Sequence, residues 1–114
     1  MSFSVDSHFE GRSPVVREIY DRLLAESRKF GPVEEDPKKT SIHLNRRSAF
    51  AGIATRREWL IVTLKALEDI DSERVFKREQ ASAKRWYHQV RLSAPGEIDA
   101  ELIGWLHDSY ELSA

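Results

Sequence analysis

The sequence has no cysteine among its 114 residues. This absence excludes disulfide bonds, thiolate catalysis and cysteine-ligated zinc or iron–sulfur sites. It is also typical of a reducing compartment, so we expect a cytoplasmic protein. No run of about 18 apolar residues is present, which is the length that a membrane-spanning helix needs. Residues 1–13 also contain no apolar stretch typical of a signal peptide. We therefore expect no contact with a membrane.

The formal net charge of −1 hides an uneven distribution along the chain. Residues 38–91 contain thirteen Lys/Arg and six Asp/Glu, a net charge of +7, whereas the two flanks together carry −8. Opposite charges on the flanks and the middle attract each other within one fold, which is the simpler interpretation. The other interpretation is a basic surface that is kept open for an anion.

Two helices are predicted, one near each end of the sequence. The first spans about residues 14–30, because Pro14 suits the first helical position and Gly31 suits the end of a helix. The second follows Asp99, a suitable N-cap, and continues to Tyr110 with apolar residues at spacings of three and four.

Between these helices the apolar period changes to two, which is typical of strands. Short connections favour antiparallel neighbours. We expect an antiparallel meander of about five strands, over residues 40–44, 49–55, 58–67, 74–80 and 85–93. The predicted fold class is α+β, with an N-terminal helix, the meander and a C-terminal helix, and with both helices on one sheet face.

Residues 13–114 are expected to form this single domain, and residues 1–12 an N-terminal arm. The strand over 58–67 raises a question about the second sheet face, because neither of its faces is polar. One face carries Trp59 and Ile61, and the other is aliphatic throughout. We expect the second face to be covered by the arm, by a partner subunit in a homodimer, or by a ligand.

The stretch KKTS at residues 38–41 ends like a phosphate-binding loop. When the pattern is aligned on Lys39, its two glycine positions hold Val33 and Lys38, and a strand rather than a helix follows. We interpret residues 34–47 as a charged hinge that leads into the strand over 40–44, with the lysines of KKTS in a solvated turn. Since no two histidines have metal-ligand spacing, we predict no metal and no cofactor.

His43 and His88 are the histidines on predicted strands. They can act together as acid and base only if their strands and faces coincide. His88 shares its face with Trp86 and Val90, and a lone histidine on an apolar face is more often a hydrogen-bonded packing residue. A small hydrolase using His43 and His88 stays an alternative, and no residue is assigned a catalytic role.

Basic and aromatic residues alternate on the last predicted strand. Arg85, Tyr87 and Arg91 share one face, which can hold phosphates by charge and bases by stacking. Together with Lys39 and His43 they form the candidate ligand-binding set. The ordinary explanation is a charged sheet edge that prevents edge-to-edge pairing. We expect a noncatalytic binding domain for an anionic ligand or nucleic acid. The alternative is a homodimeric scaffold whose interface is this face.

Several short stretches together resemble a bacterial family of domains of unknown function. They are KKTSI (38–42), AFA (49–51), HQVRL (88–92) and the segment from Ile98 through Leu106 to Tyr110. The resemblance runs from about residue 13 to the end of the sequence. It implies a small domain that stands alone or ends longer proteins, some labelled predicted transport proteins and some nuclease-like. These stretches mark a fold, and the resemblance implies no mechanism.

Overall fold

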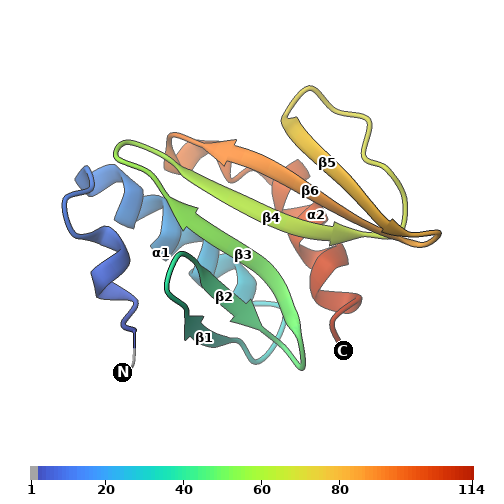
Figure 1. The fold of residues 1–114 in the computed structure, drawn as a ribbon, viewed down its shortest axis with the longest axis horizontal. Helices are drawn as coiled ribbons and strands as arrows, with labels where there is room; N and C mark the ends of the chain where they lie inside the picture. The colour runs from blue at the N-terminus through green and yellow to red at the C-terminus, as the bar shows by residue number, and fades with distance from the viewer. Residues whose placement is uncertain (1–2) are drawn as a thin grey trace.

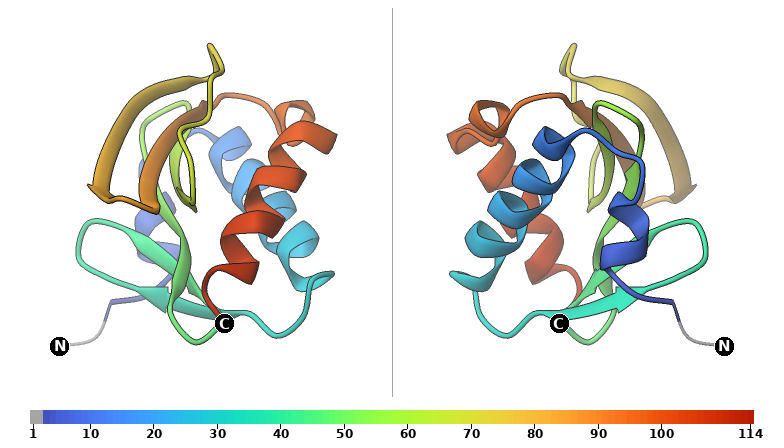
Figure 2. Two further views of the ribbon diagram at one scale, coloured as in Figure 1. Left: turned by 90° about the vertical axis from the view of Figure 1, so that its right-hand side faces the viewer. Right: turned by 90° about the vertical axis from the view of Figure 1, so that its left-hand side faces the viewer.

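The computed structural model describes residues 3–114 as two layers, a six-stranded antiparallel sheet and two helices that cover one of its faces (Figures 1 and 2). The helices are α1 (Pro14–Arg28) and α2 (Ala100–Glu111), with short 3-10 helices at Asp6–Phe9 and Pro95–Glu97. The strands are β1 (Glu34–Pro37), β2 (Ile42–Asn45), β3 (Ala49–Thr55), β4 (Leu60–Ala66), β5 (Val75–Ser82) and β6 (Arg85–Leu92). The predicted α+β class is confirmed, including both helices on one face. Residues 1–2 of the predicted arm lie outside the described residues.

The strand order is β1-β2-β3-β4-β6-β5, and every neighbouring pair is antiparallel. It differs from the predicted meander in two ways. Residues 34–37, interpreted above as part of a charged hinge, form β1 and pair with β2, with Asp36 opposite His43. The connection over residues 67–74 skips the position next to β4, so β5 lies at the edge of the sheet. The following strand, β6, then returns to lie between β4 and β5.

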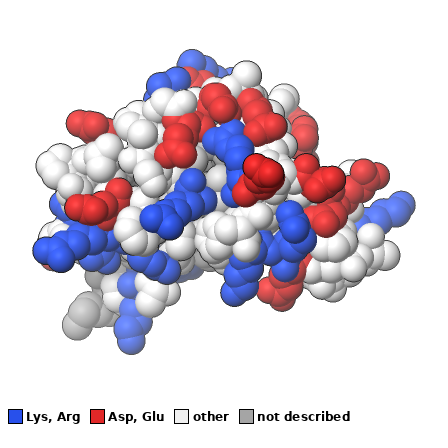
Figure 3. Space-filling view, turned by 90° about the horizontal axis from the view of Figure 1, so that it is seen from above, with Lys and Arg blue, Asp and Glu red and all other residues white. Residues whose placement is uncertain are grey.

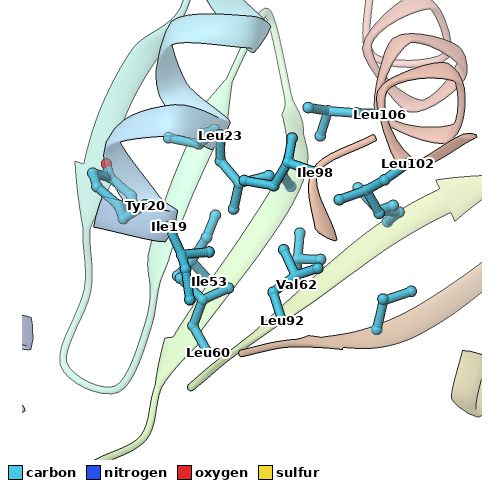
Figure 4. Close-up of a cluster of buried hydrophobic side chains, with 14 of the residues drawn as sticks. Ile19, Tyr20, Leu23, Ile53, Leu60, Val62, Leu92, Ile98, Leu102 and Leu106 are labelled. Carbon is cyan, nitrogen blue, oxygen red and sulfur yellow. The ribbon is translucent and has the colours of Figure 1, made fainter. Parts of the chain in front are cut away.

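The core lies between the helices and the inner face of the sheet (Figure 4). Its fully buried side chains include Ile19, Tyr20 and Leu23 from α1, Leu102 and Leu106 from α2, and Ile53, Leu60, Val62 and Leu92 from the strands. The predicted helix starts are confirmed. Pro14 is the first residue of α1, and Asp99 accepts a hydrogen bond from the Leu102 N–H at 3.0 Å. In residues 3–114, no helix is both long and apolar enough to cross a membrane.

The edge strand β5 is protected against pairing with another strand. Two bulges interrupt its register with β6, one at Phe76 and one at Ala81. Between the bulges, Lys77, Arg78 and Glu79 are exposed. Bulges and charges both oppose edge-to-edge association. The basic residues of this strand therefore have a sufficient structural explanation.

Candidate functional site

The outer face of the sheet, meaning the face turned away from α1 and α2, is concave and open. The β1–β2 and β5–β6 hairpins both project away from the helices (Figure 2). A hollow on this face is lined by residues of β2, β3, β4 and β6. Small side chains form the floor of this hollow, so its volume is about 470 Å³, within the range of small-molecule sites. Its lining includes His43, Gly52, Ala54, Thr63, Lys65 and Tyr87. We call this hollow the outer cavity.

The N-terminal arm, one of the three expected covers, packs elsewhere. The ring of Phe9 contacts the ring of Tyr20 on α1, with centroids 5.2 Å apart. The carbonyl oxygen of His8 accepts a hydrogen bond from the Thr55 hydroxyl at the end of β3. None of residues 3–12 lines the outer cavity. Residues 3–12 of the arm therefore leave the cavity open in the single chain.

At one end of the outer cavity, β3 and β4 separate, and two serines of the C-terminal segment fill the gap. The β3–β4 register ends at Ala51 opposite Leu64, so the next β4 residue, Lys65, has no β3 partner. Its backbone N–H donates instead to Ser109 Oγ at 2.9 Å, and that hydroxyl donates to the Phe50 carbonyl. Ser109 thus replaces one rung of the ladder, and it is fully buried.

The side chain of Lys65 continues this arrangement and ends at the cavity wall. Its Nζ donates to Ser48 Oγ at 3.0 Å and to Ser113 Oγ at 2.9 Å. Burial, and then the positive charge of Arg85, lower the pKa of Lys65. No carboxylate of residues 3–114 lies within ion-pairing distance of it. Lys65 is therefore a half-buried cation held by hydroxyl groups alone.

Two of the five candidate residues from the sequence line the outer cavity, namely His43 and Tyr87. Lys39 lies exposed in the β1–β2 turn, outside the lining. Arg91 lies toward the far end of the sheet, where it stacks over the ring of Trp59 at 4.1 Å from the centroid. Arg85 is half-buried and precedes Tyr87 by two residues on β6, so it lies beside the cavity without lining it. Only part of the predicted set is therefore brought together.

The two strand histidines lie on opposite faces of the sheet. His43 faces the outer cavity, whereas His88 is fully buried on the inner face. The Nε2 atom of His88 lies 2.9 Å from Asp69 Oδ1 and 3.0 Å from the Ile70 nitrogen, and its ring stacks on Trp86. This confirms the packing role predicted for His88. The two histidines share no cleft, so the hydrolase alternative has no geometric support.

Sequence reasoning missed Lys65 and its partners Ser48 and Ser113. The one available signal was a lysine within an otherwise apolar strand, on the face opposite Leu64. The role of the serines depends on the gap between β3 and β4, which leaves no pattern in the sequence.

Seen from above, edge-on to the sheet, the surface carries basic and acidic side chains next to each other (Figure 3). No group of three or more His, Asp or Glu residues in the described part of the chain is arranged to hold a metal ion. The outer cavity offers one lysine, hydroxyl groups, an imidazole and the ring of Tyr87 as its means of recognition.

A comparison with family models matches residues 5–113 to a family described as "Domain of unknown function (DUF5655)". The match covers nearly the whole chain. No curated protein and no solved structure matches significantly.

Proposed function

Because the chain belongs to this family of unknown function, we propose its function from the geometry: it binds an anionic ligand in the outer cavity, with Lys65 as the main charged contact. A lysine ammonium group has three N–H donors. Two of those on Lys65 are used by Ser48 and Ser113, and the described residues supply no acceptor for the third. A cation that is partly removed from water and lacks a counter-charge attracts an anion more strongly than an exposed one does. This single observation carries the proposal.

The other cavity residues suit the rest of such a ligand. Tyr87 is 36% exposed and directly opposite Lys65 in the β4–β6 register, so its ring is available for stacking beside the charge. Gly52 and Thr63 leave the floor low enough for a flat group, and His43 lines the cavity from β2. Arg85 adds a second positive charge next to the cavity. A phosphate attached to a planar ring, free or within a nucleic acid, combines these features.

Calorimetric titration with inorganic phosphate, a mononucleotide and a short single-stranded oligonucleotide tests the proposal. We expect Lys65→Met to weaken binding by about 10- to 100-fold, as expected for one charge-assisted hydrogen bond. The control is Lys29→Met, because Lys29 pairs with Glu26 on α1, away from the outer face. Unchanged affinity in Lys65→Met, or no binding of any of the three anions, would contradict the proposal.

The salt dependence of the same titration separates the two sources of the anion. A nucleic acid releases counterions when it binds, so its affinity falls steeply as salt rises, and more steeply with each added phosphate contact. A single phosphate group gives a shallower dependence. The homodimer and the cytoplasmic location stay predictions. Sedimentation of the protein at micromolar concentration tests the first of them.

A further inference from the structure

Lys65 differs from the other lysines of the chain in its surroundings. Lys29 and Lys38 form ion pairs with Glu26 and Asp36. The remaining lysines, Lys39, Lys77 and Lys84, are exposed to solvent. Only Lys65 lines the outer cavity, and its Nζ contacts hydroxyl oxygens rather than a carboxylate. These are the surroundings in which a lysine amine becomes a nucleophile.

We propose that the Lys65 amine forms an imine with an anionic ligand that carries an aldehyde or ketone group in the outer cavity. The inference rests on the anion-binding function proposed above and names the class of ligand. The positive charges of Lys65 and of Arg85 beside the cavity attract the anion, and the carbonyl group of the same ligand then meets the Lys65 amine. The floor over Gly52 and Ala54 gives room for a small ligand.

The surroundings of Lys65 raise the fraction of its amine that is neutral, because burial and then the charge of Arg85 lower its pKa. The titratable side chains that share the outer cavity with Lys65 are those of His43 and Tyr87. On its other side Lys65 borders a second pocket, whose lining includes four carboxylates, those of Glu68, Asp69, Asp108 and Glu111, and none of them forms an ion pair with Lys65. Ser48 and Ser113 bring hydroxyl groups from the β2–β3 turn and the C-terminal segment. No ionised carboxylate is thus in contact to hold the proton on the amine.

The chemistry needs no further reactant. The neutral amine attacks the carbonyl carbon, and the π electrons of the carbonyl bond move to its oxygen. One amine proton then reaches this oxygen, for which the Ser48 hydroxyl, 3.0 Å from Nζ, is a suitable relay. The resulting hydroxyl group takes the second amine proton and leaves as water. The products are one imine and one water molecule, so atoms and electrons balance.

Reductive trapping with pyridoxal 5′-phosphate tests this inference, because the probe combines an aldehyde, an aromatic ring and a phosphate. The protein is treated briefly with the probe, reduced with borohydride, digested and examined by mass spectrometry. We expect Lys65 to be modified faster than exposed Lys39 and Lys84, because a lowered pKa leaves more of its amine in the neutral, reactive form. These lysines are internal controls in every sample. Equal or slower modification of Lys65 would overturn the inference.

Titration of the original protein with phosphate separates this inference from the proposed function. The variant Lys65→Arg checks the site of trapping, because arginine forms no imine under these conditions. We expect this variant to lose the cavity modification. If the original protein binds phosphate yet Lys65 is not preferentially trapped, the imine is wrong and anion binding stands. If Lys65 is trapped but phosphate and nucleotide do not bind, the anion-binding proposal is wrong instead.

Discussion

The two faces of the sheet are made by the same strands and serve opposite purposes. On β4, the side chains of Leu60, Val62 and Leu64 are buried under the helices, while Thr63 and Lys65 face the outer cavity. The inner face has close apolar packing, and the outer face has small residues and polar groups with unused hydrogen-bonding capacity. Because successive side chains of a strand point to opposite faces, alternate residues of β4 stabilise the core and line the outer cavity.

The largest expected effect comes from matched isoleucines on the two faces. Ile53 is fully buried on the inner face, and Ile61 is half-buried on the outer face of the neighbouring strand. We expect Ile53→Ala to lower the free energy of unfolding by about 2–5 kcal/mol, and Ile61→Ala by less than about 1.5 kcal/mol. Urea denaturation of both variants measures the difference. Equal losses would show that the outer face is also packed, for example in a dimer.

The next effect concerns the gap between β3 and β4. Ser109→Ala removes the hydroxyl that joins the Phe50 carbonyl to the Lys65 N–H, and it leaves both backbone groups without their partner. We expect a loss of about 1–3 kcal/mol in the free energy of unfolding. Hydrogen exchange at the Lys65 amide should also become faster. Ser93→Ala is a suitable control, since Ser93 is exposed after β6. An unchanged exchange rate at Lys65 would refute this role of Ser109.

A smaller effect is expected at alkaline pH. The Tyr20 hydroxyl donates to Glu35 Oε2 at 2.6 Å, and burial, followed by this hydrogen bond, raises the pKa of Tyr20 above its usual value. A raised pKa means that the unfolded chain loses the phenolic proton first. Stability is then fully present below about pH 10 and falls above it. Thermal unfolding of Tyr20→Phe should show a weaker decline above pH 10 than the original protein. Parallel curves would contradict this assignment.

The smallest effect is expected at acid pH. The Leu102 N–H, and then Arg74, lower the pKa of Asp99 at the start of α2. Because the pKa of Asp99 is lower in the folded protein, its charge stabilises the fold above about pH 4. This stabilisation is lost as the pH falls further and the carboxylate becomes protonated. Asp99→Asn keeps a capping oxygen but removes the charge. Its melting temperature should fall slightly below that of the original protein at neutral pH and approach it near pH 3. A constant difference would exclude a contribution from charge.

The sequence was sufficient to predict the inner face. The apolar periods of residues 14–30 and 58–67 and the N-cap at Asp99 depend on local patterns, which burial under the helices reinforces. β1 was missed because its residues Glu34–Pro37 are acidic or proline, which are poor strand formers, and because their pairing depends on β2. The position of β5 depends on where the chain crosses after β4, which no local pattern encodes.

The outer face was predicted only in part for the same reason. The period of two indicated that His43 and Tyr87 lie on strands, but a period does not say which residues on different strands become neighbours. Lys39 and Arg91 were chosen for their charge, yet the structure places them outside the cavity. The position of Lys65 depends on α2, because Ser109 of this helix fills the gap between β3 and β4. No local sequence pattern encodes this contact.

Amide chemical shifts during titration with the tightest-binding anion test the central claim most directly. The account predicts shifts at Gly52, Thr63, Lys65 and Tyr87, all lining the outer cavity, and little change along α1 and α2. Shifts concentrated on the helices, or no shifts in any part of the sheet, would contradict an anion site on the outer face.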